Sequence, residues 1–241
     1  MSIVSFLKRR LPVPLRRQLR RAMLTLQANI FYRNDLNQLA LCFRTDKWGE
    51  HWYTQHYQRY FEPLRQKRVN LLEIGVGGYE DSDRGAESLR MWKAYFRNSR
   101  IVGIDIVDKT QFREDRIDIR HCGQTDAEAL CQLSDEYGGF DIVIDDGSHL
   151  NEHVIETFRL LFPLMRANGI YAIEDTQTAY WPTWGGGIDN PHSSTAFFKS
   201  LTDGLNHVEY PREGSTPTYF DKNIVEIAFF QIGRASCRER V

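Results

Sequence analysis

Two short acidic motifs contain the residues of this sequence that are best suited to chemistry. Residues 144–149 read IDDGSH and residues 173–175 read IED, and each motif follows an apolar run typical of a strand. In an open parallel sheet the carboxyl ends of neighbouring strands line one crevice, so we expect the acidic side chains to converge. The four carboxylates are those of Asp145, Asp146, Glu174 and Asp175.

A divalent metal would resolve the repulsion among these carboxylates. Like charges held close together repel strongly at the low effective dielectric of a protein site. Hard oxygen ligands, with room left for water or substrate hydroxyls, describe a Mg²⁺ site. The alternative is that the acids are solvated turn residues or helix caps.

His149 lies three residues after Asp146, close to the start of the next predicted helix. It could be a metal ligand, but Mg²⁺ disfavours nitrogen. An unperturbed histidine titrates near neutrality, so we predict that His149 is a general base. The alternative is a histidine that only packs against its neighbours.

A glycine-rich turn follows the first predicted strand. Residues 71–78 read LLEIGVGG, and glycines such as Gly75 and Gly77 let a ligand approach the backbone closely. The third glycine of a dinucleotide-binding fingerprint would fall at position 80, which is Glu80. That residue would repel a pyrophosphate, whereas S-adenosylmethionine has no phosphate and carries a sulfonium cation. The turn therefore favours S-adenosylmethionine and disfavours an NAD-dependent dehydrogenase.

Two further positions suit the cofactor. Asp105 ends the next predicted strand, where a carboxylate can accept hydrogen bonds from both ribose hydroxyls. Gln124 follows the third strand, where methyltransferases that use S-adenosylmethionine commonly hold the adenine edge. The alternatives are a strand-end turn for Asp105 and a helix N-cap at Thr125 or Asp126.

Apolar runs alternate with helical patterns along the chain, which indicates βαβ units and a doubly wound, mostly parallel α/β sheet. Strands are predicted at residues 70–74, 100–104, 118–121, 140–144, 169–173 and 224–230. Helices are predicted at residues 88–96, 126–136, 152–164 and 194–205, and an aromatic-rich helical stretch at 36–61 ends before Pro63.

The composition limits the classes of protein to which the chain can belong. With 241 residues, 41% of them hydrophobic, the chain fits one α/β domain. Residues 1–21 carry seven basic side chains and no acidic one, which leaves about −8 on the remainder and argues against nucleic acid. We predict that residues 1–35 form a basic, solvated and partly disordered extension, because Pro12 and Pro14 interrupt a helix. The alternative is an amphipathic helix, with residues 1–21 in peripheral contact with an anionic membrane.

Four cysteines at unpatterned positions form neither a disulfide framework nor a zinc spacing, which predicts a cytoplasmic setting. The last ten residues, IGRASCRERV, resemble the translation of a sequencing adapter. We therefore predict a methyltransferase domain at 36–231 and a non-native tail at 232–241, with the last strand of the sheet missing.

Four motifs together carry a resemblance to a known family. LLEIGVGGY, SLRMWKAYF, IDDGSH and IEDTQTAYW resemble the Mg²⁺-dependent sugar O-methyltransferases of macrolide biosynthesis, of the mycinamicin and macrocin type. The resemblance implies a Rossmann-like class I methyltransferase that methylates a deoxysugar hydroxyl of a glycosylated product. Chains of that family carry a long N-terminal auxiliary domain that is not recognised here. We therefore do not infer their oligomeric assembly or their recognition of the aglycone for this chain. A homo-oligomer is one option for its assembly.

The resemblance also implies roles for single residues. It makes Asp146, Glu174 and Asp175 the metal ligands and His149 the base. The implied cofactor pocket contains Glu73, Gly75, Ser88, Asp105 and Gln124, and we predict that Gly77 and Asp145 also belong to it.

An aromatic segment at 178–187 is predicted to form a mobile lid over the acceptor. Tyr180, Trp181 and Trp184 could contact or stack on a sugar, and the following glycines would permit closure. The alternative is an ordered, packed loop. Competing functions are methylation of a catechol-like diol and a non-catalytic subunit that binds S-adenosylmethionine and serves in assembly.

Overall fold

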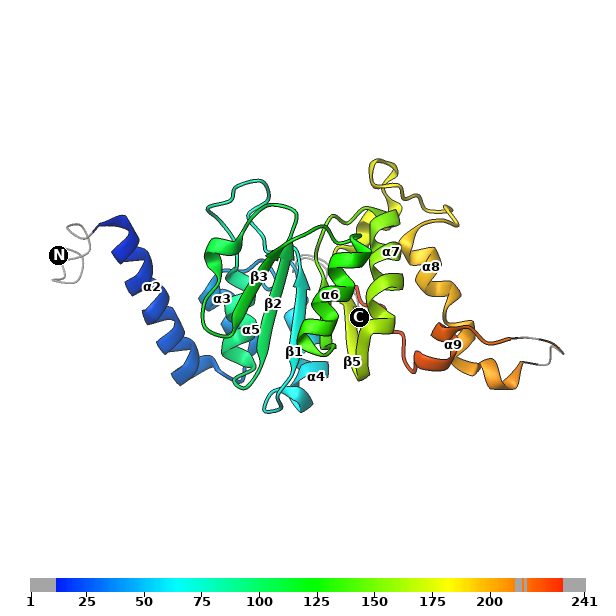
Figure 1. The fold of residues 1–241 in the computed structure, drawn as a ribbon, viewed down its shortest axis with the longest axis horizontal. Helices are drawn as coiled ribbons and strands as arrows, with labels where there is room; N and C mark the ends of the chain where they lie inside the picture. The colour runs from blue at the N-terminus through cyan, green and yellow to red at the C-terminus, as the bar shows by residue number, and fades with distance from the viewer. Residues whose placement is uncertain (1–11, 211–213, 215, 232–241) are drawn as a thin grey trace, which may run out of the picture.

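The computed structural model describes residues 12–210, 214 and 216–231. Its centre is a five-stranded sheet with the order β3-β2-β1-β4-β5, in which every neighbouring pair is parallel (Figure 1). The strands are β1 (Asn70–Ile74), β2 (Arg100–Asp105), β3 (Ile117–His121), β4 (Phe140–Asp145) and β5 (Met165–Ile173). The predicted doubly wound α/β architecture is confirmed.

The helices among the described residues connect and cover these strands. They are α2 (Val13–Gln27), α3 (Leu36–Phe43), α4 (Thr54–Phe61), α5 (Glu87–Tyr95), α6 (Ala127–Tyr137), α7 (Asn151–Leu161), α8 (Ser194–Ser200) and α9 (Tyr219–Asn223). None of them is long and apolar enough to cross a membrane.

Alternating strand residues build a hydrophobic core on each face of the sheet. Leu71 of β1 pairs in register with Ile101 and Ile142, and all three pack with α3, α4 and α5. The next residue, Leu72, belongs to the core on the other face with α6 and α7. Central strands covered on both faces are continuous apolar runs, which is why their positions were predictable from the sequence.

The predicted helical stretch at 36–61 is interrupted, which corrects the sequence interpretation. Helix α3 ends at Arg44, whose backbone is left-handed (φ 63°), and α4 begins only at Thr54. A left-handed residue at this position ends a helix by redirecting the chain. The intervening loop, residues 44–53, runs toward the carboxyl ends of the central strands and carries side chains into the site described below.

The basic N-terminal segment is helical over the part that the structure describes. Pro12 is the N-cap of α2 and Pro14 lies in its first turn. Proline is tolerated there because the first amides of a helix have no intrahelical acceptor. The two prolines thus begin this helix instead of interrupting it, and α2 extends away from the sheet (Figure 1). Membrane contact by this segment remains a prediction.

The predicted strand at 224–230 is wrong, because these residues form no strand in the structure. A strand requires a partner for its backbone groups, and no described residue pairs with this segment. Its side chains pack on α4 instead: Tyr60 donates to Glu226 at 2.7 Å, and the ring of Phe230 stacks on His56. The predicted non-native tail at 232–241 lies outside the described residues.

Two other helices differ from prediction at their ends. The stretch predicted at 194–205 is helical only to Ser200, and a 3₁₀ segment, Asp203–Glu209, follows. Helix α7 ends at Leu161 and passes into a 3₁₀ turn that contains Pro163. Proline cannot donate an amide hydrogen to an α-helical turn, which accounts for the second difference.

The turn after β1 gives a test of how tightly the strand ends are packed. Gly75 has φ +86°, and a Cβ placed there would lie 2.1 Å from the Asp146 carbonyl oxygen. We expect Gly75→Ala to lower the free energy of unfolding by about 3 kcal/mol or more, because strain and overpacking add. Gly49 is the matched control, since it has φ +99° and open space around it.

Gly49→Ala should therefore cost only the left-handed strain of about 1–2 kcal/mol. Urea unfolding of both variants measures the difference. Equal losses of unfolding free energy in Gly75→Ala and Gly49→Ala would show that the close contact between residue 75 and the Asp146 carbonyl group does not constrain the turn.

Candidate active site

The two acidic motifs meet at the carboxyl ends of β4 and β5, as expected. Asp145 pairs in register with Ile173, so the residues that follow each strand are neighbours. The Glu174 amide donates to the Asp145 carbonyl oxygen at 2.9 Å, and the Asp146 amide donates to Ile74 at 3.0 Å. Three adjacent strands therefore fix the backbone from which these carboxylates project.

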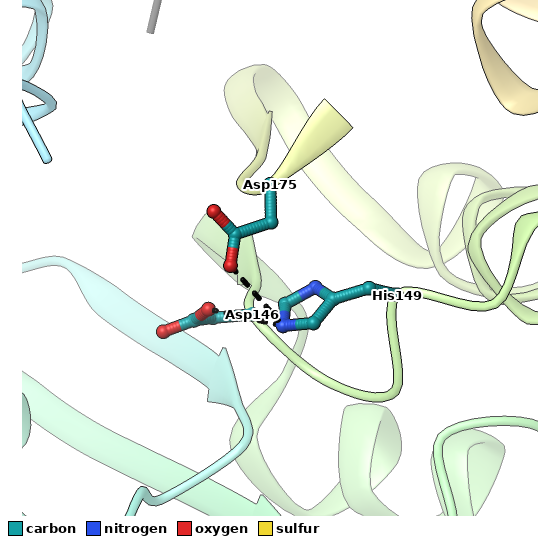
Figure 2. Close-up of side chains that lie close together, drawn as sticks. All are labelled: Asp146, His149 and Asp175. Atoms are coloured by element: carbon teal, nitrogen blue, oxygen red, sulfur yellow. Dashed lines mark ion pairs between the residues drawn. The ribbon is translucent and has the colours of Figure 1, made fainter. Parts of the chain in front are cut away.

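Asp146, His149 and Asp175 form a group that could hold a metal ion. Each offers one ligand atom, and these atoms lie within 4.8 Å of one another. His149 Nε2 is 3.4 Å from Asp175 Oδ2 and 3.8 Å from Asp146 Oδ1. Figure 2 shows the three side chains pointing toward one another. Two partly exposed carboxylates that face each other suit a hard divalent cation such as Mg²⁺.

Two residues of this group have unusual backbone conformations. His149 has φ 56° and Asp175 has φ 52°, both in the left-handed region that few residues other than glycine adopt. Such conformations persist where the surroundings impose them, and they cluster at functional sites. The strained backbone turns both side chains toward the shared space.

Glu174 is oriented differently from the other two predicted metal ligands. Its side chain is buried, and Oε1 accepts hydrogen bonds from Lys47 Nζ and from the Tyr57 hydroxyl, both at 2.7 Å. Burial, and then the charge of Asp146, raise the pKa of Glu174 well above its usual value. Because Oε1 is engaged, Glu174 can reach a metal only through Oε2, and its role as a ligand remains a prediction.

Lys47, which sequence reasoning missed, is the centre of the buried part of the site. Its ammonium lies 2.8 Å from Asp146 Oδ2, 2.7 Å from Glu174 Oε1 and 3.2 Å from Glu73 Oε1. Only 1% of this side chain is exposed. Burial acts to lower the pKa of Lys47, but the three carboxylates outweigh it and raise the pKa. No local motif marks this lysine, because its partners are far away in the sequence.

Asp175 is held by aromatic residues of the same segment as Lys47. The Tyr53 hydroxyl donates to Asp175 Oδ1 at 2.6 Å and accepts from the Asp175 amide at 3.0 Å. His51 stacks on Tyr53 and lies 3.7 Å from the same carboxylate oxygen. Burial alone would raise the pKa of Asp175, but the hydrogen bonds from Tyr53 and Gln177 outweigh it and lower the pKa. Asp175 is therefore ionised at neutral pH, as a metal ligand must be.

A cavity of about 570 Å³ adjoins this group along the glycine-rich turn. Three predicted cofactor-binding residues, Gly75, Gly77 and Ser88, line it, together with Lys47 and Asp146. Through Asp146, the acidic group therefore borders the space where the cofactor was predicted to lie.

Glu73 lies behind this cavity and is fully buried. Its Oε2 accepts from Trp92 Nε1 at 3.0 Å, and its Oε1 faces Lys47. Burial, opposed by the charge of Lys47, raises the pKa of Glu73 to about 7. A direct contact between Glu73 and the cofactor remains a prediction.

Asp105 is at the end of β2, as predicted, and its carboxylate is fixed by backbone amides. Oδ2 accepts from Val76 and Oδ1 accepts from Val107, each at 2.8 Å. These bonds tie β2 to the glycine-rich turn and leave lone pairs on both oxygens. The ribose contact remains a prediction that this geometry permits.

Gln124 and Asp145 form a buried polar link between two loops. Gln124 Oε1 accepts from the Ser148 amide at 2.7 Å, and Nε2 donates to Thr157 and to Asp145. Burial is the main cause that raises the pKa of Asp145 to about 7. The neighbouring Asp126 caps α6 by accepting from the Ala129 amide, which is the N-cap that the sequence analysis gave as an alternative.

The aromatic segment 178–187 contains the end of the 3₁₀ segment Thr176–Tyr180 and a second 3₁₀ turn, Pro182–Trp184, and its motion as a lid remains a prediction. The buried Asn151 donates to the carbonyl oxygens of Thr178 and Trp184 at 3.1 and 2.8 Å. The Trp184 ring lies 6.1 Å from the His149 ring, beside the candidate metal group. Tyr180 and Trp181 are about half exposed, and their contact with substrate remains a prediction.

A second buried lysine, also missed by sequence reasoning, organises the glycine-rich turn. Lys109 is fully buried and donates to the carbonyl oxygens of Tyr79, Asp81 and Arg84 at 3.1, 2.6 and 3.0 Å. Because the Lys109 ammonium bonds to three carbonyl oxygens of one segment, it fixes the backbone of residues 79–84 beside the cavity.

No protein-family model matches the chain. The chain is 48% identical over 196 residues to the demethylmacrocin O-methyltransferase of Streptomyces fradiae, which covers 79% of this chain and 50% of that protein. It is 46% identical over 211 residues to the mycinamicin VI 2''-O-methyltransferase of Micromonospora griseorubida, and the match covers 83% of this chain and 53% of that protein. The chain thus spans about half the length of the curated relatives it matches.

Solved structures give the same result. The MycE methyltransferase from the mycinamycin biosynthetic pathway, in complex with Mg and SAH, superposes with a TM-score of 0.79 at 46% identity. The match covers 81% of this chain and 51% of that one. A complex of the same enzyme that also contains mycinamycin VI superposes with a TM-score of 0.78. The fold is that of a Rossmann-like class I methyltransferase.

Lys109 gives a test of how the glycine-rich turn is held. We expect Lys109→Met to lower the free energy of unfolding by about 3 kcal/mol or more, because three carbonyl oxygens lose a charged donor and hydrogen bonds to charged groups contribute about 1.5–3 kcal/mol each. Lys93, which pairs with Glu114 at the surface, is the matched control. Lys93→Met should cost no more than about 1 kcal/mol. Similar stabilities of the two variants in urea would show that Lys109 does not organise the turn.

Proposed function

The chain is a homologue of sugar O-methyltransferases from antibiotic pathways, and we propose on this premise that it transfers a methyl group from S-adenosylmethionine to a sugar hydroxyl with the help of Mg²⁺. The acceptor would be a deoxysugar of a glycosylated natural product or glycan. The observation that carries the proposal is the convergence of Asp146, His149 and Asp175 beside the cavity at the glycine-rich turn.

The residues at the site fit both S-adenosylmethionine and Mg²⁺. The cavity borders backbone with left-handed glycines, which lets a ligand approach closely, and the Asp146 carboxylate on its wall suits a sulfonium cation. Asp146 and Asp175 would hold Mg²⁺, with Glu174 as a third ligand through Oε2. When bound, Mg²⁺ lowers the pKa of a coordinated hydroxyl and orients it.

The chain's own residues supply the proton transfer and the positioning. His149 Nε2 faces the space between the two aspartates and would accept the hydroxyl proton of the acceptor. Asp175, kept ionised by Tyr53, fixes that imidazole from one side. Trp184 flanks His149 and would stack on a sugar ring, while the glycine-rich turn would align the activated methyl group for in-line attack.

We place this activity in the cytoplasm. The described cysteines, Cys42, Cys122 and Cys131, are free thiols, which suits a reducing compartment.

Removal of metal tests the proposal as a whole. Purified protein, labelled S-adenosylmethionine and a panel of rhamnosides, other deoxysugar glycosides and catechols are assayed with and without EDTA. We expect transfer to a glycoside that EDTA lowers by about 100-fold or more and that excess Mg²⁺ restores, since metal assistance contributes several kcal/mol. Full activity in EDTA would contradict the metal role, and transfer only to catechols would contradict the sugar acceptor.

The base is tested separately by His149→Ala. We expect kcat to fall by about 10² to 10⁴, the usual contribution of general acid–base catalysis, while affinity for S-adenosylmethionine stays nearly unchanged. His192→Ala, at an exposed position, is the control and should behave as the wild type. Wild-type turnover of His149→Ala at neutral pH would show that the histidine is not the base.

A further inference from the structure

The carboxylate oxygens of the site form two groups that face different partners. The inner group surrounds the buried Lys47 ammonium and consists of Glu73 Oε1, Asp146 Oδ2 and Glu174 Oε1, at 2.7–3.2 Å. The outer group consists of Asp146 Oδ1 and Asp175 Oδ2, which face His149.

Asp146 belongs to both groups through different oxygens. Oδ2 binds Lys47 at 2.8 Å, and Oδ1 lies 3.8 Å from His149 Nε2. Glu174 likewise uses only Oε1 for Lys47 and Tyr57. A carboxylate whose two oxygens point to two separate positions, as those of Asp146 do, is the arrangement of a two-metal site, in which each position holds one cation.

We propose that Lys47 fills the inner of two cation positions in this acidic cluster, with Asp146 bridging to the outer one, and so limits the cluster to a single divalent metal. This inference rests on the proposed function, because it takes the outer group as the metal site. Lys47 is then a positioning residue: it acts by fixing the free oxygens of Asp146 and Glu174 toward the metal.

The surroundings of Lys47 support a permanent role as a cation. Glu73 and Glu174 are buried, so each of their carboxylates requires a partner of opposite charge or a hydrogen bond, whereas Asp146 is 25% exposed. Lys47 is 1% exposed, and its backbone is held by the Thr45 hydroxyl and by the Thr54 amide. The ammonium is therefore shielded from solvent although Lys47 borders the cavity, whereas the outer group is partly exposed.

Counting bound Mn²⁺ tests the proposal without any assay of catalysis. Mn²⁺ binding is followed by the EPR signal of the free ion, in the absence of S-adenosylmethionine and acceptor, for the wild type, Lys47→Arg and Lys47→Met. We expect about one Mn²⁺ per chain for the wild type and for Lys47→Arg, which keeps the charge. Lys47→Met should bind about two, because the vacated inner carboxylates become ligands.

A count of one in Lys47→Met, with the affinity of the wild type, would overturn the role of Lys47 while leaving the proposed function intact. No Mn²⁺ binding by the wild type would contradict both. The two proposals therefore fail in distinguishable ways.

A second variant covers the case in which Lys47→Met does not fold. Glu174→Gln is added to it, and thermal unfolding of the single and double variants is compared without metal. If Lys47 serves as a counter-charge, removing one inner carboxylate should raise the melting temperature of Lys47→Met. A double variant that is no more stable than the single one would show that Lys47 contributes packing alone, and would overturn the proposal.

Discussion

Charge that is removed from water has to be matched by opposite charge or by hydrogen bonds, and this requirement governs the end of the sheet where β1, β4 and β5 finish. Glu73, Asp146 and Glu174 share the one ammonium of Lys47. Asp145, also buried, is linked to the amide of Gln124 instead. Toward His149 the carboxylates of Asp146 and Asp175 are partly exposed, and that is where a divalent cation fits.

The balance depends on a segment that precedes the sheet in sequence. The loop at 44–53 and the start of α4 supply Lys47, Tyr53 and Tyr57, each of which bonds to a carboxylate after β4 or β5. The same helices also cover one face of the sheet. The N-terminal helices are thus part of the candidate active site, and a sheet without them would expose uncompensated carboxylates.

Much of this arrangement could be predicted from the sequence, and the rest could not, for physical reasons. The five parallel strands and the convergence of the acidic motifs follow from local apolar runs and from the geometry of strand ends. Lys47 could not be predicted, because its partners Asp146 and Glu174 are 99 and 127 residues away and no motif marks it. The apolar pattern at 224–230 predicted a strand, but a pattern cannot supply the backbone partner that a strand requires.

The position of a bound divalent ion relative to Lys47 tests these relationships most directly. Anomalous scattering from crystals of the chain grown with Mn²⁺ and S-adenosylhomocysteine would locate the ion. We predict one peak, within about 2.4 Å of oxygens of Asp146 and Asp175, with Lys47 still bonded to Glu174. A peak at the place of the Lys47 ammonium, with the lysine displaced, would contradict the division of the cluster into an inner ammonium and an outer metal.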